Sequence, residues 1–105
     1  MNYYMMMVIV PLGHSDKVIM AANEAGATGA TILRARGADN SAKEGLFSFK
    51  VEPEEEIVLI TATKEVTDAV CSRIHDEFEK NSKRSGSVYV LPVQRVEEGD
   101  KQINM

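Results

Sequence analysis

Residues 26–37, GATGATILRARG, combine three glycines, two threonines and two arginines in one short stretch. Glycine, hydroxyl and guanidinium groups together are typical of loops that bind phosphate. In phosphate-binding loops, however, the glycine turn follows a strand and opens a helix, so that backbone amides meet the anion. Here the glycine turn follows an expected helix and leads into an expected strand. We therefore interpret Gly26 and Gly29 as a helix end and a tight turn, and place any ligand contact near Gly37.

Other residue types that could do chemistry stand apart from one another. His14 precedes the first expected helix, His75 lies in the middle of the second, and neither stands at metal-ligand spacing. Cys71 lies one residue from an apolar helical stripe, where a cysteine acts as a small hydrophobic residue. No nucleophile motif and no arrangement of carboxylates suggests hydrolysis. We predict no catalytic residue, no metal site and no enzymatic activity.

Composition narrows the class of partner. The chain has 105 residues, 44% of them hydrophobic, with a net charge of −4, which argues against nucleic acid because phosphate binding needs a basic surface. The stretch GLFSFKVE at residues 45–52 is similar to an RNA-binding strand, but the first expected strand lacks the aromatic residue that would stack on a base. One cysteine, no basic leader and no apolar run of about 20 residues indicate a single cytoplasmic domain.

Apolar runs and helical stripes alternate in the order strand, helix, strand, strand, helix, strand. The expected strands are residues 3–10, 31–36, 57–62 and 87–93, and the expected helices are residues 16–25 and 64–80. The helical stripes are Val18, Ala21, Ala22 and Ala25, then Val66, Val70, Ile74 and Phe78 with Ala69 beside them. Right-handed crossovers then favour an α+β, ferredoxin-like βαββαβ sandwich, an antiparallel sheet with two helices on one face.

The segment before the third strand leaves two arrangements open. Residues 46–49 return to extended structure, and Pro53, which cannot donate to a ladder, interrupts the run within EPEEE. One long interrupted strand and a small hairpin both fit this pattern. The glutamates repel one another, so we expect ion pairs with the basic residues of a neighbouring strand or subunit, namely Arg34, Arg36, Lys83 or Arg84.

The ends of the elements carry local signals. Ser15 and Thr63 stand where N-caps begin the two helices, and Gly26 stands where a left-handed glycine ends the first. We divide the chain into a domain at residues 1–96 and a charged tail without periodicity at residues 97–105.

Three stretches resemble the nitrogen regulatory protein PII superfamily: EAGATGATILRARG, EEEIVLITATKEVTDAV and SGSVYVLPVQRV. That family has the pattern G-x-x-G-x-T entering its second strand and a last strand close to G-K-I-F-V-L-P-V. The resemblance covers residues 8–96 and implies a compact homotrimer with effector clefts between subunits. It also implies an adenine nucleotide (ATP, ADP or AMP) or another anionic metabolite as effector. The regulated partner would be a transporter or a metabolic enzyme, with membrane association only through that partner.

The resemblance also implies where the effector binds. Thr31 and Gly37 match residues that line the nucleotide cleft, and Gly86 matches the last glycine of the phosphate-cradling turn. Arg36 lies at the mouth of the shortened loop at residues 38–45, which we expect ligand binding to order. Two further candidates are Arg84, as a substitute positive charge, and Ser87, where the family has lysine.

Departures from the family pattern leave alternatives open. The family's Gly-Asp-Gly-Lys turn reads RSGS here, and Glu54 and Glu56 stand where nitrogen sensors have basic residues. We therefore expect no binding of 2-oxoglutarate. The main alternative is an interaction scaffold derived from the PII family that has lost nucleotide binding. A ferredoxin-like enzyme is a third class, which would need clustered titratable groups with shifted pKa values.

Overall fold

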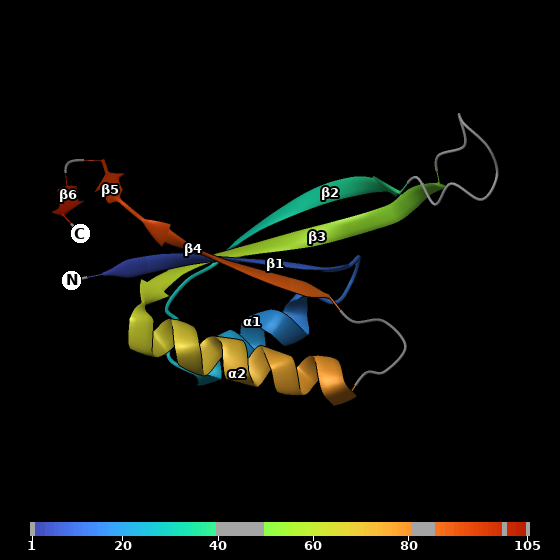
Figure 1. Cartoon of the computed structure of the whole chain (residues 1–105), viewed down its shortest axis with the longest axis horizontal. Helices are drawn as coiled ribbons and strands as arrows, with labels where there is room; N and C mark the ends of the chain where they lie inside the picture. The colour runs from blue at the N-terminus through green and yellow to red at the C-terminus, as the bar shows by residue number, and fades with distance from the viewer. Residues whose placement is uncertain (1, 40–49, 81–85, 100, 105) are drawn as a thin grey trace.

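The computed structural model describes residues 2–39, 50–80, 86–99 and 101–104. Strands β1 (Tyr3–Pro11), β2 (Thr31–Asp39), β3 (Lys50–Thr63) and β4 (Ser87–Val93) form one antiparallel sheet in the order β2-β3-β1-β4. Helices α1 (Ser15–Glu24) and α2 (Lys64–Lys80) both lie on the same face of this sheet (Figure 1). The predicted ferredoxin-like sandwich is confirmed.

The hydrophobic core lies between the sheet and the two helices. Along the central strand β1, burial alternates with the two-residue period of a pleated strand, so every second side chain points at the helices. The buried apolar residues, at 5% exposure or less, are Met6, Val8, Val10, Val18, Ala21, Ala22, Val58, Ile60, Val70 and Ile74. Both predicted helical stripes therefore face the sheet, with Ala25, Val66 and Phe78 partly buried against the core.

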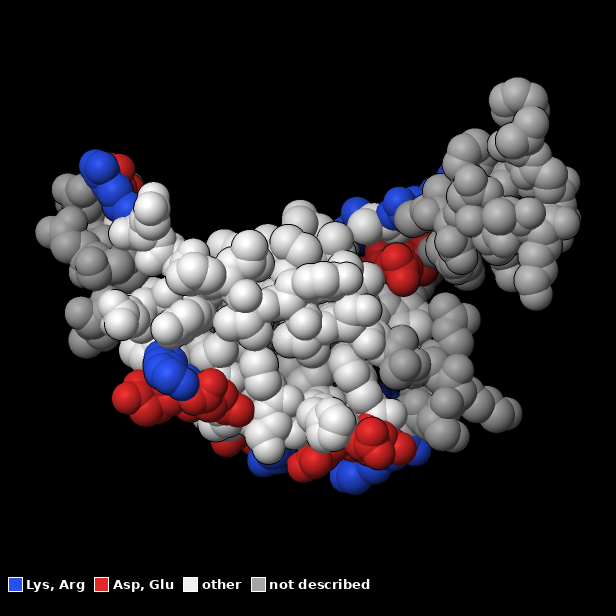
Figure 2. Space-filling model, in the orientation of Figure 1, with Lys and Arg blue, Asp and Glu red and all other residues white. Residues whose placement is uncertain are grey.

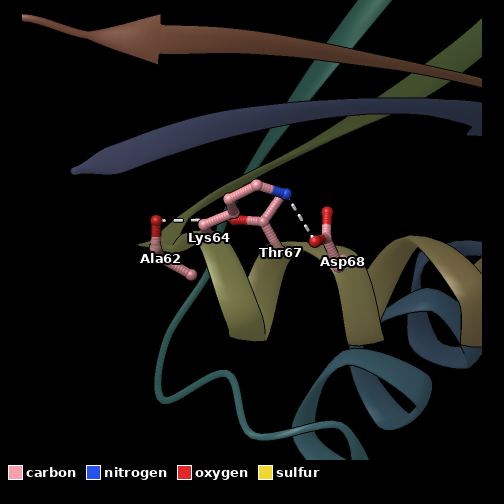
Figure 3. A network of polar contacts seen from close by, with 4 residues as sticks. All are labelled: Ala62, Lys64, Thr67 and Asp68. Carbon is pink, nitrogen blue, oxygen red and sulfur yellow. Dashed lines mark hydrogen bonds and ion pairs between the residues drawn. The ribbon is translucent and has the colours of Figure 1, made fainter.

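One member of the predicted α2 stripe is wrong. Ala69 is exposed, and Thr67 is the buried neighbour of the stripe, with 3% of its surface exposed. The burial of this threonine is compatible with a polar hydroxyl because its Oγ1 donates a hydrogen bond to the Ala62 carbonyl at 3.4 Å (Figure 3). At the same helix start, Lys64 Nζ donates to Asp68 Oδ2 at 2.8 Å across one turn. The Thr67 bond joins the first turn of α2 to the end of β3, and the Lys64–Asp68 pair lies within the helix.

The end of α1 follows the sequence prediction. Gly26 has φ of +112°, its amide donates to the Asn23 carbonyl at 3.0 Å, and the Ala27 amide donates to the Ala22 carbonyl at 2.9 Å. This pair of bonds is a Schellman motif, which satisfies the last carbonyls of the helix. Gly26 therefore ends a helix and is not part of a phosphate loop.

Strand β3 runs through Pro53 without a break. Arg36 pairs with Glu54 and Ala38 pairs with Val51, so Gly37 alone stands opposite two residues of β3, one of them Pro53. This bulge accommodates a residue that cannot donate to the ladder. From residue 50 onward the long-strand alternative is correct, whereas residues 46–49 and most of the predicted loop at 38–45 lie outside the described residues.

The chain continues past β4 into a second, small sheet. Strands β5 (Arg95–Glu98) and β6 (Lys101–Asn104) form an antiparallel hairpin, and Gly99 near its turn has φ of +51°. Residues expected to be an aperiodic tail are thus largely a hairpin, which projects beyond one end of the main sheet (Figure 1). In the part of the chain that the structure describes, neither helix combines the length and hydropathy that crossing a membrane requires.

Candidate functional site

The predicted site residues fall into two groups on opposite edges of the sheet. Thr31, Arg36 and Gly37 belong to the edge strand β2, whereas Gly86 and Ser87 lie at the start of the other edge strand, β4. Strands β3 and β1 separate the two edges, which puts about 14 Å between them at the usual strand spacing. A single chain does not bring the two groups into contact. The sixth candidate, Arg84, lies outside the described residues.

The two groups nevertheless lie toward the same end of the sheet. Ser87 pairs with Ile9, Ile9 pairs with Ile57, and Ile57 pairs with Leu33, so Ser87 and Leu33 stand in one row across all four strands. Arg36 lies three residues further along β2, in the direction in which β2 and β3 extend beyond β1. Ligand groups at this end could therefore approach either edge.

Near the Gly37 bulge, arginines of β2 lie opposite glutamates of β3. Arg34 Nη1 lies 3.7 Å from Glu54 Oε1, which confirms the predicted pairing between these two strands. Arg36 is exposed, and within the described ranges no ion pair holds its guanidinium group. The charge of Arg34, by contrast, is partly neutralised.

Gly86 has a steric role that the sequence did not reveal. A Cβ atom at this position would overlap the Ile9 carbonyl oxygen, and would lie 2.9 Å from the Phe78 ring and 3.0 Å from Val10 Cγ1. Only glycine lets the chain pass between β1 and α2 at this point. The need for glycine at position 86 is therefore explained by packing, whether or not a ligand also approaches it.

Glu56 is a residue whose role the sequence analysis missed. Its Oε1 accepts hydrogen bonds from the Gly13 amide at 2.9 Å and the Ser15 amide at 3.2 Å, at the start of α1. A hydrogen bond from the Ser15 side chain, then those from the two amides and the charge of Arg34, outweigh partial burial and lower the pKa of Glu56 below its ordinary 4.5. Ser15 is the first helical residue and not the predicted N-cap. No local sequence signal marks this partnership, because the partners are 41 and 43 positions apart.

The pocket beside the candidate residue Gly86 is small. A cavity of about 30 Å³ lies between β1 and the two helices, with Val10, His14, Val18, Phe78 and Gly86 among its lining residues. Small-molecule sites are usually about ten times larger. Among the described residues, no group of three or more His, Cys, Asp or Glu side chains could hold a metal ion.

The face of the sheet opposite the helices is largely apolar, and neither helix of the described residues covers it. The register places Met5, Met7 and Ile9 of β1 on this open face together with residues of the other three strands: Leu33, Ile57, Leu59, Tyr89 and Leu91. Leu33, Tyr89 and Leu91 are 45%, 54% and 47% exposed. Figure 2 shows a broad surface without charged side chains in the middle of the molecule, with charges along the helices and near the two projecting ends.

The sequence of this chain matches the model of a known protein family. The model for the nitrogen regulatory protein P-II matches residues 3–99, nearly the whole chain, and the chain belongs to that family. No curated protein sequence matches the chain significantly.

Solved structures with the same fold are distant in sequence. The chain is similar to GlnK of B. subtilis in complex with ATP, with a TM-score of 0.73, 17% identity, and 90% and 84% of the two chains covered. It is also similar to a PII-like signalling protein from Thermus thermophilus (TM-score 0.66, 20% identity, 88% and 87% covered). A third similar structure is CPII from Thiomonas intermedia bound to ADP and bicarbonate (TM-score 0.67, 16% identity, 100% and 91% covered). At these identities the likeness establishes the fold alone.

Proposed function

We propose that this protein is a regulatory, non-enzymatic member of the PII family that assembles as a homotrimer and binds a small anionic effector between subunits. The observation that carries the proposal is the separation of the candidate residues onto the two edges of one sheet. The pocket beside Gly86 has a volume of about 30 Å³, which is too small for such an effector, and no described residue of β2 lines it. A cleft between two copies of the chain would bring residues of opposite edges together and provide a larger site.

The open face supports assembly. A sheet that buries one face against helices and leaves an apolar second face exposed is stabilised when another copy covers it. The apolar strand β1 is buried on the helix side and only half-buried on the other. A homotrimer built around this face would protect β1 on both sides.

The residues on the two edges suit a ligand that carries a negative charge and also has neutral hydrogen-bonding groups. Arg36 would donate charge-assisted hydrogen bonds to a phosphate or carboxylate, and the Ser87 hydroxyl and the backbone around Gly37 and Gly86 would supply neutral contacts. Adenine nucleotides are the first candidates, since GlnK is solved with ATP and CPII with ADP and AMP. Glu54 and Glu56 add negative charge beside Arg34, so we expect 2-oxoglutarate to bind poorly.

Regulation would act on a partner protein in the cytoplasm, such as a transporter or a metabolic enzyme, with nitrogen metabolism as the first process to examine. Effector binding would change the segment carried by the far ends of β2 and β3, and so the surface offered to that partner. Binding to a membrane transporter would be the only association with a membrane.

Titration calorimetry tests the proposal with ATP, ADP, AMP and bicarbonate as probes. We expect at least one to bind, and Arg36→Ala to weaken it at least tenfold, because a hydrogen bond to a charged group contributes about 1.5–3 kcal/mol. Arg84→Ala tests the substitute positive charge that the sequence predicts, and Arg73→Ala, on α2 where it pairs with Glu24 of α1, is the control that should leave affinity within twofold. If no probe binds or raises the melting temperature, the scaffold alternative replaces this proposal.

A further inference from the structure

The first turn of α1 takes its cap from a distant strand. His14 occupies the N-cap position but makes no side-chain cap hydrogen bond. The carboxylate of Glu56 on β3 accepts the amides of Gly13 and Ser15 instead, at 2.9 and 3.2 Å. Amides at a helix start have no partner within the helix, and a carboxylate there is favoured by hydrogen bonding and by the helix dipole.

A second bond fastens the same turn to the same strand. The Leu12 amide donates to the Glu54 carbonyl at 3.3 Å, just beyond Glu55, where the pairing of β1 with β3 ends. Gly13 directly follows Leu12, and its own amide donates to Glu56. It bends the chain here with φ of +90°, a conformation that residues other than glycine rarely adopt. The β1–α1 turn is therefore held against β3 at two successive points.

The turn lies between the two groups of candidate site residues. On one side, Arg34 of β2 acts on the Glu56 carboxylate and pairs with Glu54 at 3.7 Å, next to Arg36. On the other side, His14 lines the same small cavity as Gly86, and Gly86 lies directly against Ile9 of β1. The turn thus lies between the two groups, bonded to β3 on one side and separated from Gly86 by a small cavity on the other.

We propose that Glu56 is a positioning residue whose carboxylate joins the start of α1 to the base of the extended β2–β3 pair, so that the two open as one unit. Removing the carboxylate leaves the Gly13 and Ser15 amides without acceptors and removes a negative charge near Arg34. The Leu12–Glu54 backbone bond then holds the turn to β3 alone, and the β2–β3 pair beyond Glu55 loses one of its two anchors to the turn. The consequence for regulation rests on the proposed function, but the coupling itself does not.

Hydrogen–deuterium exchange on the full chain without ligand tests the coupling. In Glu56→Ala we expect exchange at least tenfold faster than in the wild type at the amides of Gly13 and Ser15, and also at those of Ala35 and Glu55, which face each other across β2 and β3. Glu55→Gln is the matched control, one residue away on the opposite face of β3, and should change these rates less than twofold. Unchanged exchange at Gly13 and Ser15 in Glu56→Ala overturns the proposal, and so does faster exchange confined to those two amides.

Two additions keep the test decisive. Glu56→Gln keeps an oxygen acceptor without the charge, so it should fold if Glu56→Ala does not, and its exchange rates at the four amides should rise together by a smaller factor. With ADP as probe, the wild type should slow exchange at Ala35 and Glu55, and the Glu56 variants should lose this slowing while still binding ADP. Slowing that persists in the variants overturns the coupling. Failure of the wild type to bind ADP overturns the proposed nucleotide effector, while the ligand-free exchange still decides the role of Glu56.

Discussion

At position 86 the chain passes between β1 and α2 with no room for a side chain. The same glycine directly precedes β4 and is a candidate for ligand contact. Packing and ligand binding would therefore both favour a residue without a side chain at this position. Glu56 shows the converse situation: its side chain has the chemistry of an anion and fills an amide site that would otherwise be open to an external anion. At the scale of single residues, geometry therefore decides which polar groups remain available to a ligand.

Gly86→Ala should destabilise the protein strongly. The added methyl group overlaps the Ile9 carbonyl and crowds Phe78, and overpacking of this kind costs about 1–3 kcal/mol. Urea unfolding at one protein concentration measures the loss, and Gly29→Ala is the control because a Cβ there meets open space. Equal stability of the two variants would show that the close approach at Gly86 relaxes freely.

Glu56 should make stability depend on pH in the acid range. Its pKa in the folded state lies below the ordinary 4.5, so its contribution is fully present above about pH 4.5 and is lost as pH falls through the lower folded value. Glu56→Gln should therefore flatten the decline of the unfolding free energy below pH 4.5. A pH series of chemical unfolding curves tests this, and a decline equally steep in the variant would contradict it.

Two kinds of contact hold the helical layer together, and their magnitudes differ. Ile74 of α2 is fully buried against the sheet, whereas Arg73 and Glu24 join α2 to α1 through an exposed ion pair. Burial of an apolar side chain contributes far more than an exposed ion pair, whose contribution is about 0–1 kcal/mol. The position of the helices is therefore set by the apolar stripes.

Ile74→Ala should cost about 2–5 kcal/mol of unfolding free energy, from lost burial and the cavity left behind. Glu24→Gln, which removes the ion pair on the adjacent side of α2, should cost less than about 1 kcal/mol. Both are measured by equilibrium unfolding at the same concentration, since assembly makes apparent stability depend on it. If Glu24→Gln proved as costly as Ile74→Ala, the ion pair and not the stripe would position α2.

The main sheet has one face that the two helices cover and one largely apolar face that neither described helix covers. Exposed apolar residues also occur singly elsewhere, as Met20 does on α1 with 63% of its surface exposed. The difference is continuity, because the register joins the open-face residues across all four strands. A continuous apolar face is typical of a surface that another protein covers.

Leu91→Glu should therefore block assembly, because burying an unpaired charge in an apolar interface is costly. We expect light scattering after gel filtration to give the wild type about three times the 11.6 kDa of one chain and the variant a single chain. Met20→Glu, equally apolar and more exposed but on α1, should leave the mass unchanged. A wild-type mass of 11.6 kDa would contradict the trimer.

Local patterns in the sequence were sufficient for the order of the elements in the main sheet and its helices. The i, i+4 stripe of α2 and the apolar run of β1 predict a helix and a strand because burial repeats with the period of the backbone. Gly26 was likewise interpreted correctly, since a helix end needs a left-handed residue at a fixed position. Ala69 was assigned to the core by the same rule and is exposed, because spacing does not say how wide the buried stripe is.

The sequence by itself determined which segments fold into the strands and helices of the sandwich, and which of their faces are apolar, because those properties depend on neighbours along the chain. Only the tertiary structure decided that Glu56 caps α1, that Gly86 must lack a side chain, and that residues 95–98 and 101–104 pair as a hairpin. It alone also separated Arg36 and Ser87 onto opposite edges of the sheet. The physical reason is the same in each case. These features depend on which residues or strands come together in space, and local periodicity does not encode that.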